Sequence, residues 1–183
     1  MKLINYLRAR FRKWLNEEIW LEDYIKAGLK IGKNVSIQPG VIFDISHAWL
    51  IEIDDNVIIA PQTYILAHDT STKRCCGMTR LAKVYIGQNV FIGAGSFIMP
   101  GVTIAENSII GANSVVTKNI PPNVVAVGNP AKIICSVEEY KNKVLEDFNK
   151  SPQYDYTYTL NGGITEEKKK EMINAISKNG YVK

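Results

Sequence analysis

The chain has 183 residues, 46% of them hydrophobic, and a net charge of +4, which fits one folded domain with short appendages. It contains no run of the roughly 18 to 20 apolar residues that a membrane-spanning helix needs, and its charge gives little support for nucleic-acid binding. Three cysteines, two of them the adjacent Cys75 and Cys76, do not form a disulfide framework and favour a cytoplasmic location.

Residues 1–30 are predicted to form an amphipathic N-terminal helix. Leu7, Phe11 and Trp14 recur at three- to four-residue spacing, while basic residues occupy the other faces. The segment lacks the apolar core and cleavage site of a signal peptide. Two interpretations stay open. The apolar stripe packs against protein, or the helix lies on the inner face of a membrane with Trp14 and Trp20 as anchors.

Residues 31–134 are organised by a repeat of six residues. Between Val84 and Ile120 an aliphatic residue returns at every sixth position, a spacing that would scatter it over several faces of a helix. The residue two positions earlier is small or branched, so the pair points to one side of a short strand. Three positions later stands a residue that accepts positive φ. The repeat predicts a solenoid whose strands are joined by turns at Asn34, Gly40, Asn56, Asn89, Gly95, Gly101, Asn107, Asn113 and Asn119, with Gln62 as the exception in residue type.

The repeat is interrupted twice, and each interruption contains a histidine. The first is FDISHAWL, residues 43–50, which includes Asp44 and His47. The second is a loop insertion at residues 67–83, where the sequence YILAHD places His68 at the position of a turn residue. The chain has no other histidines. Because insertions in repeat proteins gather on one face and often carry the function, these two segments form the candidate site.

Residues 135–183 are predicted to form a C-terminal helical extension. The segment SVEEYKNKVLEDFNK offers Ser136 as an N-cap and has glutamates in its first turn. YDYTYTLNGG, residues 154–163, alternates like a strand that ends in a turn. A last helix is predicted from Thr165 to Gly180. None of these features indicates a function.

The repeat resembles that of the hexapeptide-repeat acyltransferases, in particular the maltose, galactoside and nodulation-factor O-acetyltransferases. The motifs PGVTI, GANSVVTK and GNPAK carry the resemblance, which covers about residues 31–134. It implies a mainly β fold, a left-handed parallel β-helix solenoid with an N-terminal helix and a C-terminal helical tail. The handedness follows from the resemblance alone, since crossovers between parallel strands are usually right-handed. The resemblance also implies a homotrimer with active sites between neighbouring chains.

The same resemblance implies transfer of an acetyl group from acetyl-CoA to a hydroxyl of a sugar or glycan precursor. His68 matches the general base of these enzymes, a role that suits an imidazole because it is largely neutral at cytoplasmic pH. Asp44, His47 and Asp69 are expected to contact the acceptor or to support the base. For Asp44, a polar turn closed by an Asx-type hydrogen bond is an equal alternative. No serine or cysteine is visibly paired with a base, so direct transfer in a ternary complex is expected.

Acetyl-CoA is therefore expected as a co-substrate, and no metal ion is expected. Relatives bind the pantetheine arm through main-chain groups and the phosphates through basic side chains, whose point charges suit phosphate. Phe91 replaces a tryptophan of several relatives and keeps an aromatic wall. The residues implied at the donor site are Phe91, Ala94, Ala112, Thr117, Lys118 and Lys132.

Other functions fit the repeat less well. The γ-class carbonic anhydrases need three histidines for zinc, and this chain has two. Serine acetyltransferases carry a large helical N-terminal domain, for which 30 residues are too few. A xenobiotic or amino-sugar N-acetyltransferase of the same fold stays open. So does a non-catalytic scaffold that docks on a membrane through residues 1–30.

Overall fold

The structure, a computed structural model, describes residues 19–183. The chain divides into two compact units, with the boundary between Ser136 and Val137. Among the helices of the described part, none has both the length and the apolar character that crossing a membrane requires. Most of the N-terminal helix predicted for residues 1–30 falls on residues 1–18, outside the described residues.

The described part of that predicted helix contains one short helix, α2 (Leu21–Lys26). Tyr24 on α2 is buried, and its ring packs edge-on against Phe43 with the ring centroids 5.2 Å apart. The prediction is wrong for residues 27–30, because Gly28 adopts a φ of 102° and Lys30 already belongs to a strand. A side chain at Gly28 would come within 2.8 Å of the Cβ atom of Trp49, so the glycine lets these two segments touch.

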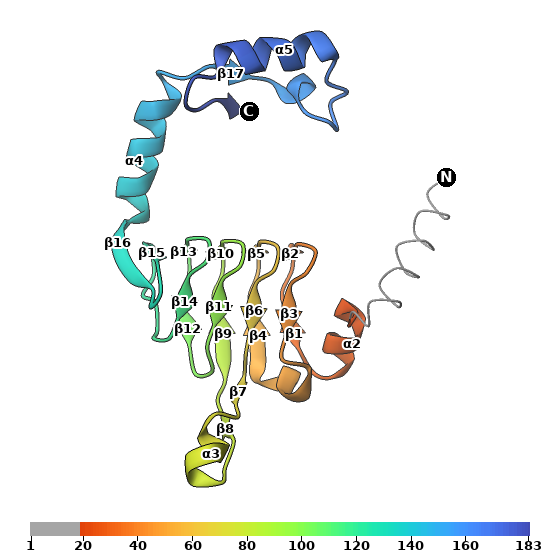
Figure 1. Ribbon diagram of the computed structural model, residues 1–183, viewed down its shortest axis with the longest axis vertical. Coiled ribbons are helices and arrows are strands. Elements are labelled where there is room, and N and C mark those ends of the chain that lie inside the picture. Colours follow the sequence, from red (N-terminus) through yellow and green to blue (C-terminus); the bar gives the residue numbers. More distant parts are fainter. Residues whose placement is uncertain (1–18) are drawn as a thin grey trace, which may run out of the picture. The chain divides into compact units, whose positions relative to one another are not determined.

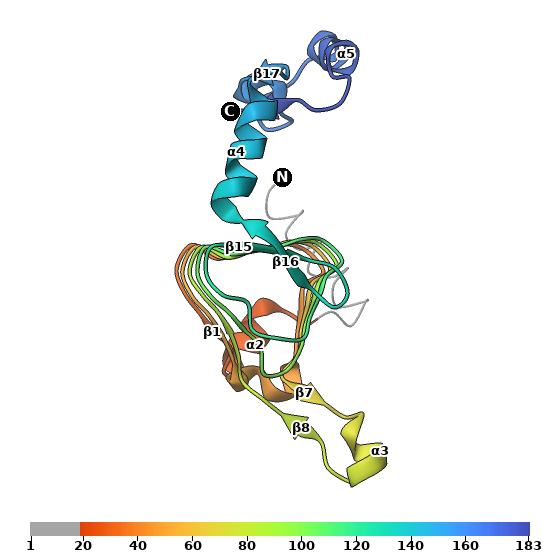
Figure 2. The same ribbon diagram turned by 90° about the vertical axis from the view of Figure 1, so that its left-hand side faces the viewer.

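The first unit is mainly β, as predicted, and its described residues form three sheets of short parallel strands. The chain passes through all three sheets before it returns to the first (Figures 1 and 2). One sheet contains β1 (Lys30–Ile31), β4 (Ile51–Ile53), β9 (Val84–Ile86) and β12 (Thr103–Ile104). The second contains β2 (Ser36–Ile37), β5 (Ile58–Ile59), β10 (Phe91–Ile92), β13 (Ile109–Ile110) and β15 (Val124–Val127). The third contains β3 (Ile42–Phe43), β6 (Tyr64–Ile65), β11 (Phe97–Ile98) and β14 (Val115–Val116).

The aliphatic residues of the repeat form the core enclosed by these sheets. Parallel pairing places Ile65 opposite Ile98, and Ile98 opposite Val116, and all three are fully buried. The residue two positions earlier is buried with them, as predicted. Where it is Ser114, its hydroxyl donates a hydrogen bond to the carbonyl of Gly111 at 2.7 Å. Each buried aliphatic side chain contributes about 1.5 to 3 kcal/mol, so the repeat itself stabilises the fold.

The turns between strands have positive φ at nearly all of the predicted positions. Gln62 adopts the same conformation, with a φ of 59°. The prediction is wrong for Asn119, whose Oδ1 accepts a hydrogen bond from the Thr103 N–H at 2.9 Å, and the next positive φ comes at Asn123. The predicted positions that are confirmed are Asn34, Gly40, Asn56, Asn89, Gly95, Gly101, Asn107 and Asn113.

Replacement of Gln62 by asparagine is expected to stabilise the protein. A left-handed conformation costs a residue other than glycine roughly 1 to 2 kcal/mol, and asparagine tolerates it best. Gln62→Asn should therefore raise the free energy of unfolding in urea by about 0.5 to 1 kcal/mol. The reverse change at another exposed turn, Asn113→Gln, should lower it by a similar amount. A shift of the same sign in both variants would contradict this explanation.

The parallel pattern ends at residues 124–136. β15 pairs in parallel with β13, and β16 (Lys132–Ser136) then runs antiparallel to β15. Because β16 returns along β15, it pairs with the edge that a further turn of the repeat would occupy. The repeat is thus closed at this end by a hairpin.

The second unit contains the helices α4 (Val137–Phe148) and α5 (Glu166–Ala175). The start predicted for the last helix is confirmed, because the Oγ1 of Thr165 accepts a hydrogen bond from the Lys168 N–H at 3.4 Å. The predicted end near Gly180 is wrong. The chain leaves α5 after Ala175, and residues Tyr181–Val182 form strand β18, which pairs with β17 (Gln153–Tyr154).

The strand predicted for residues 154–163 is wrong beyond Tyr154. Asp155 accepts a hydrogen bond from the Thr157 N–H at 2.8 Å and caps a 3-10 helix, η2 (Tyr156–Tyr158). This local bond between a short polar side chain and the backbone competes with the extended conformation, and here it prevails.

Candidate active site

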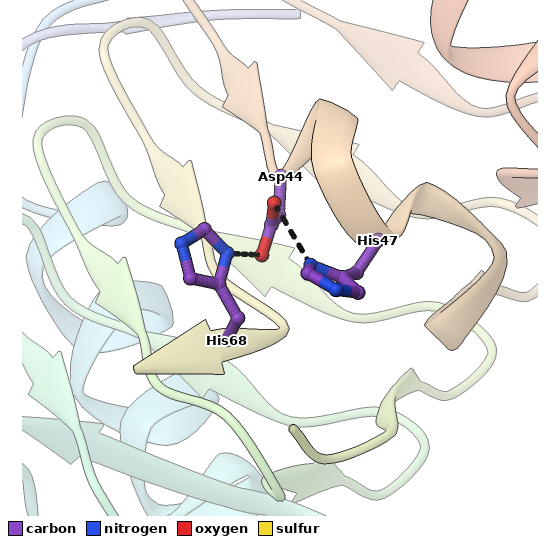
Figure 3. Close-up of side chains that lie close together, drawn as sticks. All are labelled: Asp44, His47 and His68. Carbon is purple, nitrogen blue, oxygen red and sulfur yellow. Dashed lines mark hydrogen bonds and ion pairs between the residues drawn. The ribbon is translucent and has the colours of Figure 1, made fainter. Parts of the chain in front are cut away.

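The two interruptions of the repeat meet because they follow paired strands. β3 and β6 pair in register, and the N–H of Asp44 donates to the carbonyl of Ile65 at 2.9 Å just beyond them. The chain then forms the 3-10 helical segment η1 (Ile45–Leu50), which is kinked at His47, where φ is −140° and ψ is 35°. After β6 the insertion forms an antiparallel hairpin of β7 (His68–Asp69) and β8 (Arg80–Leu81), with α3 (Thr72–Cys76) between them. Asp44, His47 and His68 thereby lie side by side (Figure 3).

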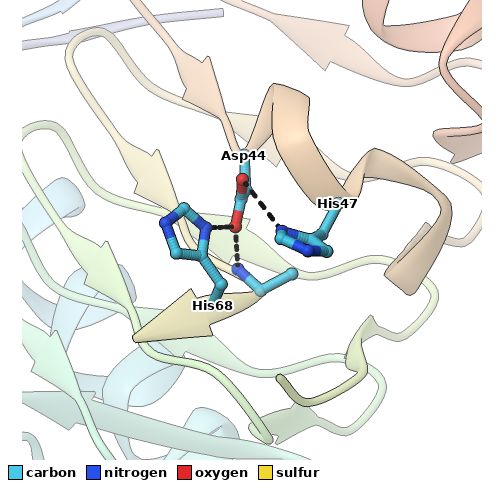
Figure 4. A network of polar contacts seen from close by, with 4 residues as sticks. Asp44, His47 and His68 are labelled. Carbon is cyan, nitrogen blue, oxygen red and sulfur yellow. Dashed lines mark hydrogen bonds and ion pairs between the residues drawn. The ribbon is translucent and has the colours of Figure 1, made fainter. Parts of the chain in front are cut away.

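Asp44 is the buried centre of this cluster, with only 5% of its surface exposed. Its Oδ2 accepts a hydrogen bond from the Ala67 N–H at 3.1 Å and contacts Nδ1 of His68 (Figure 4). An ionised carboxylate can only accept, so Nδ1 carries the proton and Nε2 keeps its lone pair. The His68 side chain is 30% exposed, and Nε2 points away from Asp44 (Figure 3). Asp44 therefore orients the His68 ring with Nε2 directed away from the carboxylate.

His47 lies on the other side of the same carboxylate. Its Nδ1 is 3.9 Å from Oδ1 of Asp44, which is too long for a hydrogen bond. This Nδ1 is buried, and it has no hydrogen-bond partner among the described residues. The His47 ring is 5.2 Å from the His68 ring, measured between centroids. The cluster thus holds a second imidazole that a simple base-and-carboxylate pair does not need.

Trp49 is a candidate site residue that the sequence analysis did not single out. Its side chain is 56% exposed, and its ring centroid is 5.3 Å from that of His47. Trp49 therefore places an exposed aromatic ring directly beside the cluster. Its position beside His47, within an interruption of the repeat, is the sequence feature that could have identified it.

Asp69 is adjacent to His68 but interacts with a different group. Its Oδ1 accepts a hydrogen bond from the Ser71 N–H at 2.8 Å. Hydrogen bonds from Ser71, helped by the charges of Arg80 and His68, hold the pKa of the Asp69 carboxyl below its usual range. Asp69 therefore fixes the start of the hairpin that carries His68. Its expected contact with the acceptor stays a prediction.

Three of the predicted donor-site residues lie together. Thr117, Lys118 and Lys132 line one groove of about 370 Å³, with Pro130 and Ala131 between them in the wall. Thr117 follows β14, which lies two strands from β6 in the third sheet. Because neighbouring strands are about 4.8 Å apart, the segment after β14 is roughly 10 Å from the segment that leads to His68. The segment that begins the groove therefore lies on the same sheet as the segment that leads to His68, two strands away.

The other three predicted donor-site residues lie outside this groove. Phe91 is on the outer face of β10 and partly exposed, while Ala94 and Ala112 are exposed in the turns at Gly95 and Asn113. The carbonyl of Ala94 accepts a hydrogen bond from the Asn113 N–H at 2.8 Å, so it already has a partner within the chain. A contact of these residues with the donor stays a prediction.

Comparison with known proteins adds to this picture. Residues 83–118 match the family described as "Bacterial transferase hexapeptide (six repeats)". Protein CapG of Staphylococcus aureus is 35% identical over 182 residues, which cover 96% of this chain and 99% of CapG. The protein named "Putative acetyltransferase YvoF" of Bacillus subtilis (strain 168) is 33% identical over 137 residues, or 74% of this chain and 76% of YvoF.

Among solved structures, a hexapeptide-repeat-containing acetyltransferase of Vibrio cholerae O1 biovar eltor, complexed with acetyl coenzyme A, is similar. It shares 32% identity over 60% of each chain, with a TM-score of 0.54. With its repeat and these relatives, the chain belongs to the bacterial hexapeptide-repeat transferases. The acetyltransferase names of two of these relatives support a transferase activity for this chain, as the resemblance implied.

Proposed function

We propose that the protein transfers the acetyl group of acetyl-CoA to a hydroxyl of a sugar or glycan precursor. The observation that carries this proposal is the contact between buried Asp44 and Nδ1 of His68, which leaves Nε2 free at an exposed edge. The acetyl-CoA complex of the Vibrio cholerae relative supports the choice of donor. We further propose that the parallel repeat is a left-handed β-helix, and that three chains assemble with the active sites between them.

The chemistry requires one base and no covalent enzyme intermediate. Nε2 of His68 removes the proton of the acceptor hydroxyl as its oxygen attacks the thioester carbonyl. The new C–O bond forms, the C–S bond breaks, and the coenzyme A thiolate leaves with the bonding electron pair. The imidazolium formed at His68 then gives its proton to that thiolate, and Asp44 stabilises the imidazolium in between.

The direct test is release of free coenzyme A thiol. The protein is mixed with acetyl-CoA and separate acceptors: monosaccharides, nucleotide sugars, amino sugars, a xenobiotic amine and serine. Thiol release that depends on a sugar hydroxyl supports the proposal. Release only with amines would assign an N-acetyltransferase instead, and no release above acetyl-CoA hydrolysis would contradict both and favour a scaffold. Product analysis by mass spectrometry then identifies the acetylated hydroxyl.

Loss of Lys118 and Lys132 together is expected to weaken donor binding. Each ammonium lines the groove and would meet a phosphate of coenzyme A, and a charged hydrogen bond is worth about 1.5 to 3 kcal/mol. The Lys118→Ala/Lys132→Ala variant should therefore raise the KM for acetyl-CoA about 10-fold or more, with kcat little changed. Lys30→Ala is the control, because Lys30 pairs with Glu52 on another sheet. An equal KM effect in the control would indicate general charge attraction rather than a site.

Trp49→Ala is expected to raise the KM for a sugar acceptor. The exposed ring beside His47 offers an apolar surface for the C–H face of a pyranose, and such aromatic contacts are worth about 0.5 to 1.5 kcal/mol. The KM should rise about 2- to 10-fold, and Trp49→Phe should restore most of it. The KM for acetyl-CoA should stay unchanged in both variants. An unchanged acceptor KM in Trp49→Ala would remove Trp49 from the site.

A further inference from the structure

One feature of the active-site cluster is not used by the proposed reaction. Nδ1 of His47 is buried without a hydrogen-bond partner among the described residues, and it faces Oδ1 of Asp44 across 3.9 Å. Asp44, His47 and His68 each offer one ligand atom, and these three atoms lie within 4.8 Å of one another. We propose that this cluster is a binding site for one divalent transition metal ion of the zinc type, which switches the enzyme off when it binds.

The donor set fits such an ion. Two imidazole nitrogens and one carboxylate oxygen are ordinary zinc ligands, with metal–ligand distances of about 2.0 to 2.2 Å. Ligand atoms in a tetrahedral site are then roughly 3.3 Å apart, so side-chain rotations that close the widest spacing by up to about 1.5 Å and open the Asp44–His68 contact would complete it. A magnesium or calcium ion would prefer a set of oxygen ligands, which this cluster does not offer.

The surroundings of the cluster also suit a metal site. Asp44 is buried, and its Oδ2 accepts a hydrogen bond from the Ala67 N–H at 3.1 Å. This backbone group, which would not itself bind the metal, already orients the carboxylate. The His68 side chain is 30% exposed, which leaves a path for the ion and a position for a water ligand. The bound ion would satisfy the buried nitrogen of His47, and this nitrogen is the observation that distinguishes the proposal from a simple catalytic pair.

The effect of the ion on activity rests on the proposed function. In the active form the proton of His68 is on Nδ1 and the lone pair on Nε2 is the base. When the metal takes Nδ1, the ring proton moves to Nε2, and no net proton is released from this ring. His68 then has no lone pair to accept the proton of the acceptor hydroxyl. Metal binding and base catalysis are therefore mutually exclusive.

The binding test uses the full chain after treatment with a chelator. It needs the Cys75→Ser/Cys76→Ser background, because these exposed thiols lie 3.3 Å apart and would also bind zinc. Calorimetric titration with Zn²⁺ should give one equivalent bound. His47→Phe keeps an aromatic ring without a ligand atom and should weaken binding about 10-fold or more. Asp54→Asn, at a carboxylate outside the cluster that accepts from the Tyr85 hydroxyl at 3.1 Å, should leave the affinity unchanged.

Two further measurements keep the proposal falsifiable if His47→Phe proves unstable by circular dichroism. Co²⁺ should give visible absorption bands of a tetrahedral site without a thiolate charge-transfer band, and Zn²⁺ should displace it. Zn²⁺ should also inhibit thiol release, and a chelator should restore it. Absence of binding, or equal binding by His47→Phe, overturns the site. If Zn²⁺ binds but does not lower the activity, the proposed inhibition by the metal is overturned. If no acetyl transfer occurs at all, the proposed function fails, and the titration still decides whether the cluster binds a metal ion.

Discussion

Replacement of His68 by alanine is expected to lower kcat by about 100- to 10,000-fold, because general base catalysis contributes a factor of that size. Its imidazole is the exposed ring of the cluster that a carboxylate orients. Binding of acetyl-CoA should be intact, since His68 follows β6 whereas the lysine-lined groove follows β14 and β15. Thiol release measures kcat, and calorimetric titration with coenzyme A measures donor binding.

His47→Ala is the matched comparison for this substitution. His47 is the other histidine of the chain, and its Nδ1 is 3.9 Å from Asp44, outside hydrogen-bonding distance. Its loss should reduce kcat much less than the loss of His68. If His68→Ala leaves turnover unchanged and His47→Ala abolishes it, the base is His47. If neither substitution matters, neither histidine is the base.

The sequence predicts the three-sheet core well because the determinants are local and repeated. A strand of two residues, a turn and a return are encoded within six residues, so each turn at Asn or Gly is decided by its own φ preference. The same logic explains Asn119. Directly after Asn119 comes Ile120, which forms a β-bridge with Ile104. The Asn119 side chain accepts a hydrogen bond from the Thr103 N–H, and its backbone does not adopt the positive φ of a turn.

The sequence predicts the second unit less well because its strands pair over long separations. The pairing of Tyr181 with Gln153 requires the chain to leave α5 well before the glycine that looks like its end. The hydrogen bond from the Thr157 N–H to Asp155 likewise replaces an apparent alternation with a 3-10 turn. Neither competition can be decided from periodicity alone.

For the candidate site, sequence analysis finds the residues but not their partners. The interruptions identify Asp44, His47 and His68, because each breaks a strict repeat. Which imidazole contacts the carboxylate depends on the register of β3 against β6, in which Phe43 pairs with Ile65. That register is set by core packing some 20 residues apart in the chain, so the spacing of the residues alone could not decide which ring Asp44 orients, and only the resemblance favoured His68.

Asp44→Asn is expected to lower kcat about 10- to 100-fold, because a charge-assisted hydrogen bond contributes about 1.5 to 3 kcal/mol. The amide keeps an oxygen that can accept from the Ala67 N–H, so the fold should be retained. It lacks the negative charge that stabilises an imidazolium, and the neutral amide oxygen that replaces Oδ2 accepts more weakly from Nδ1 of His68.

The decisive measurement is the double variant Asp44→Asn/His68→Ala. If Asp44 acts through His68, the double variant should have the kcat of His68→Ala alone, because the carboxylate has no imidazole left to orient. Asp54→Asn is the control, since Asp54 is a partly buried aspartate that accepts from the Tyr85 hydroxyl at 3.1 Å on another sheet. Additive losses in the double variant would instead mean that Asp44 touches the substrate itself, and the acceptor KM of Asp44→Asn should then rise together with the fall in kcat.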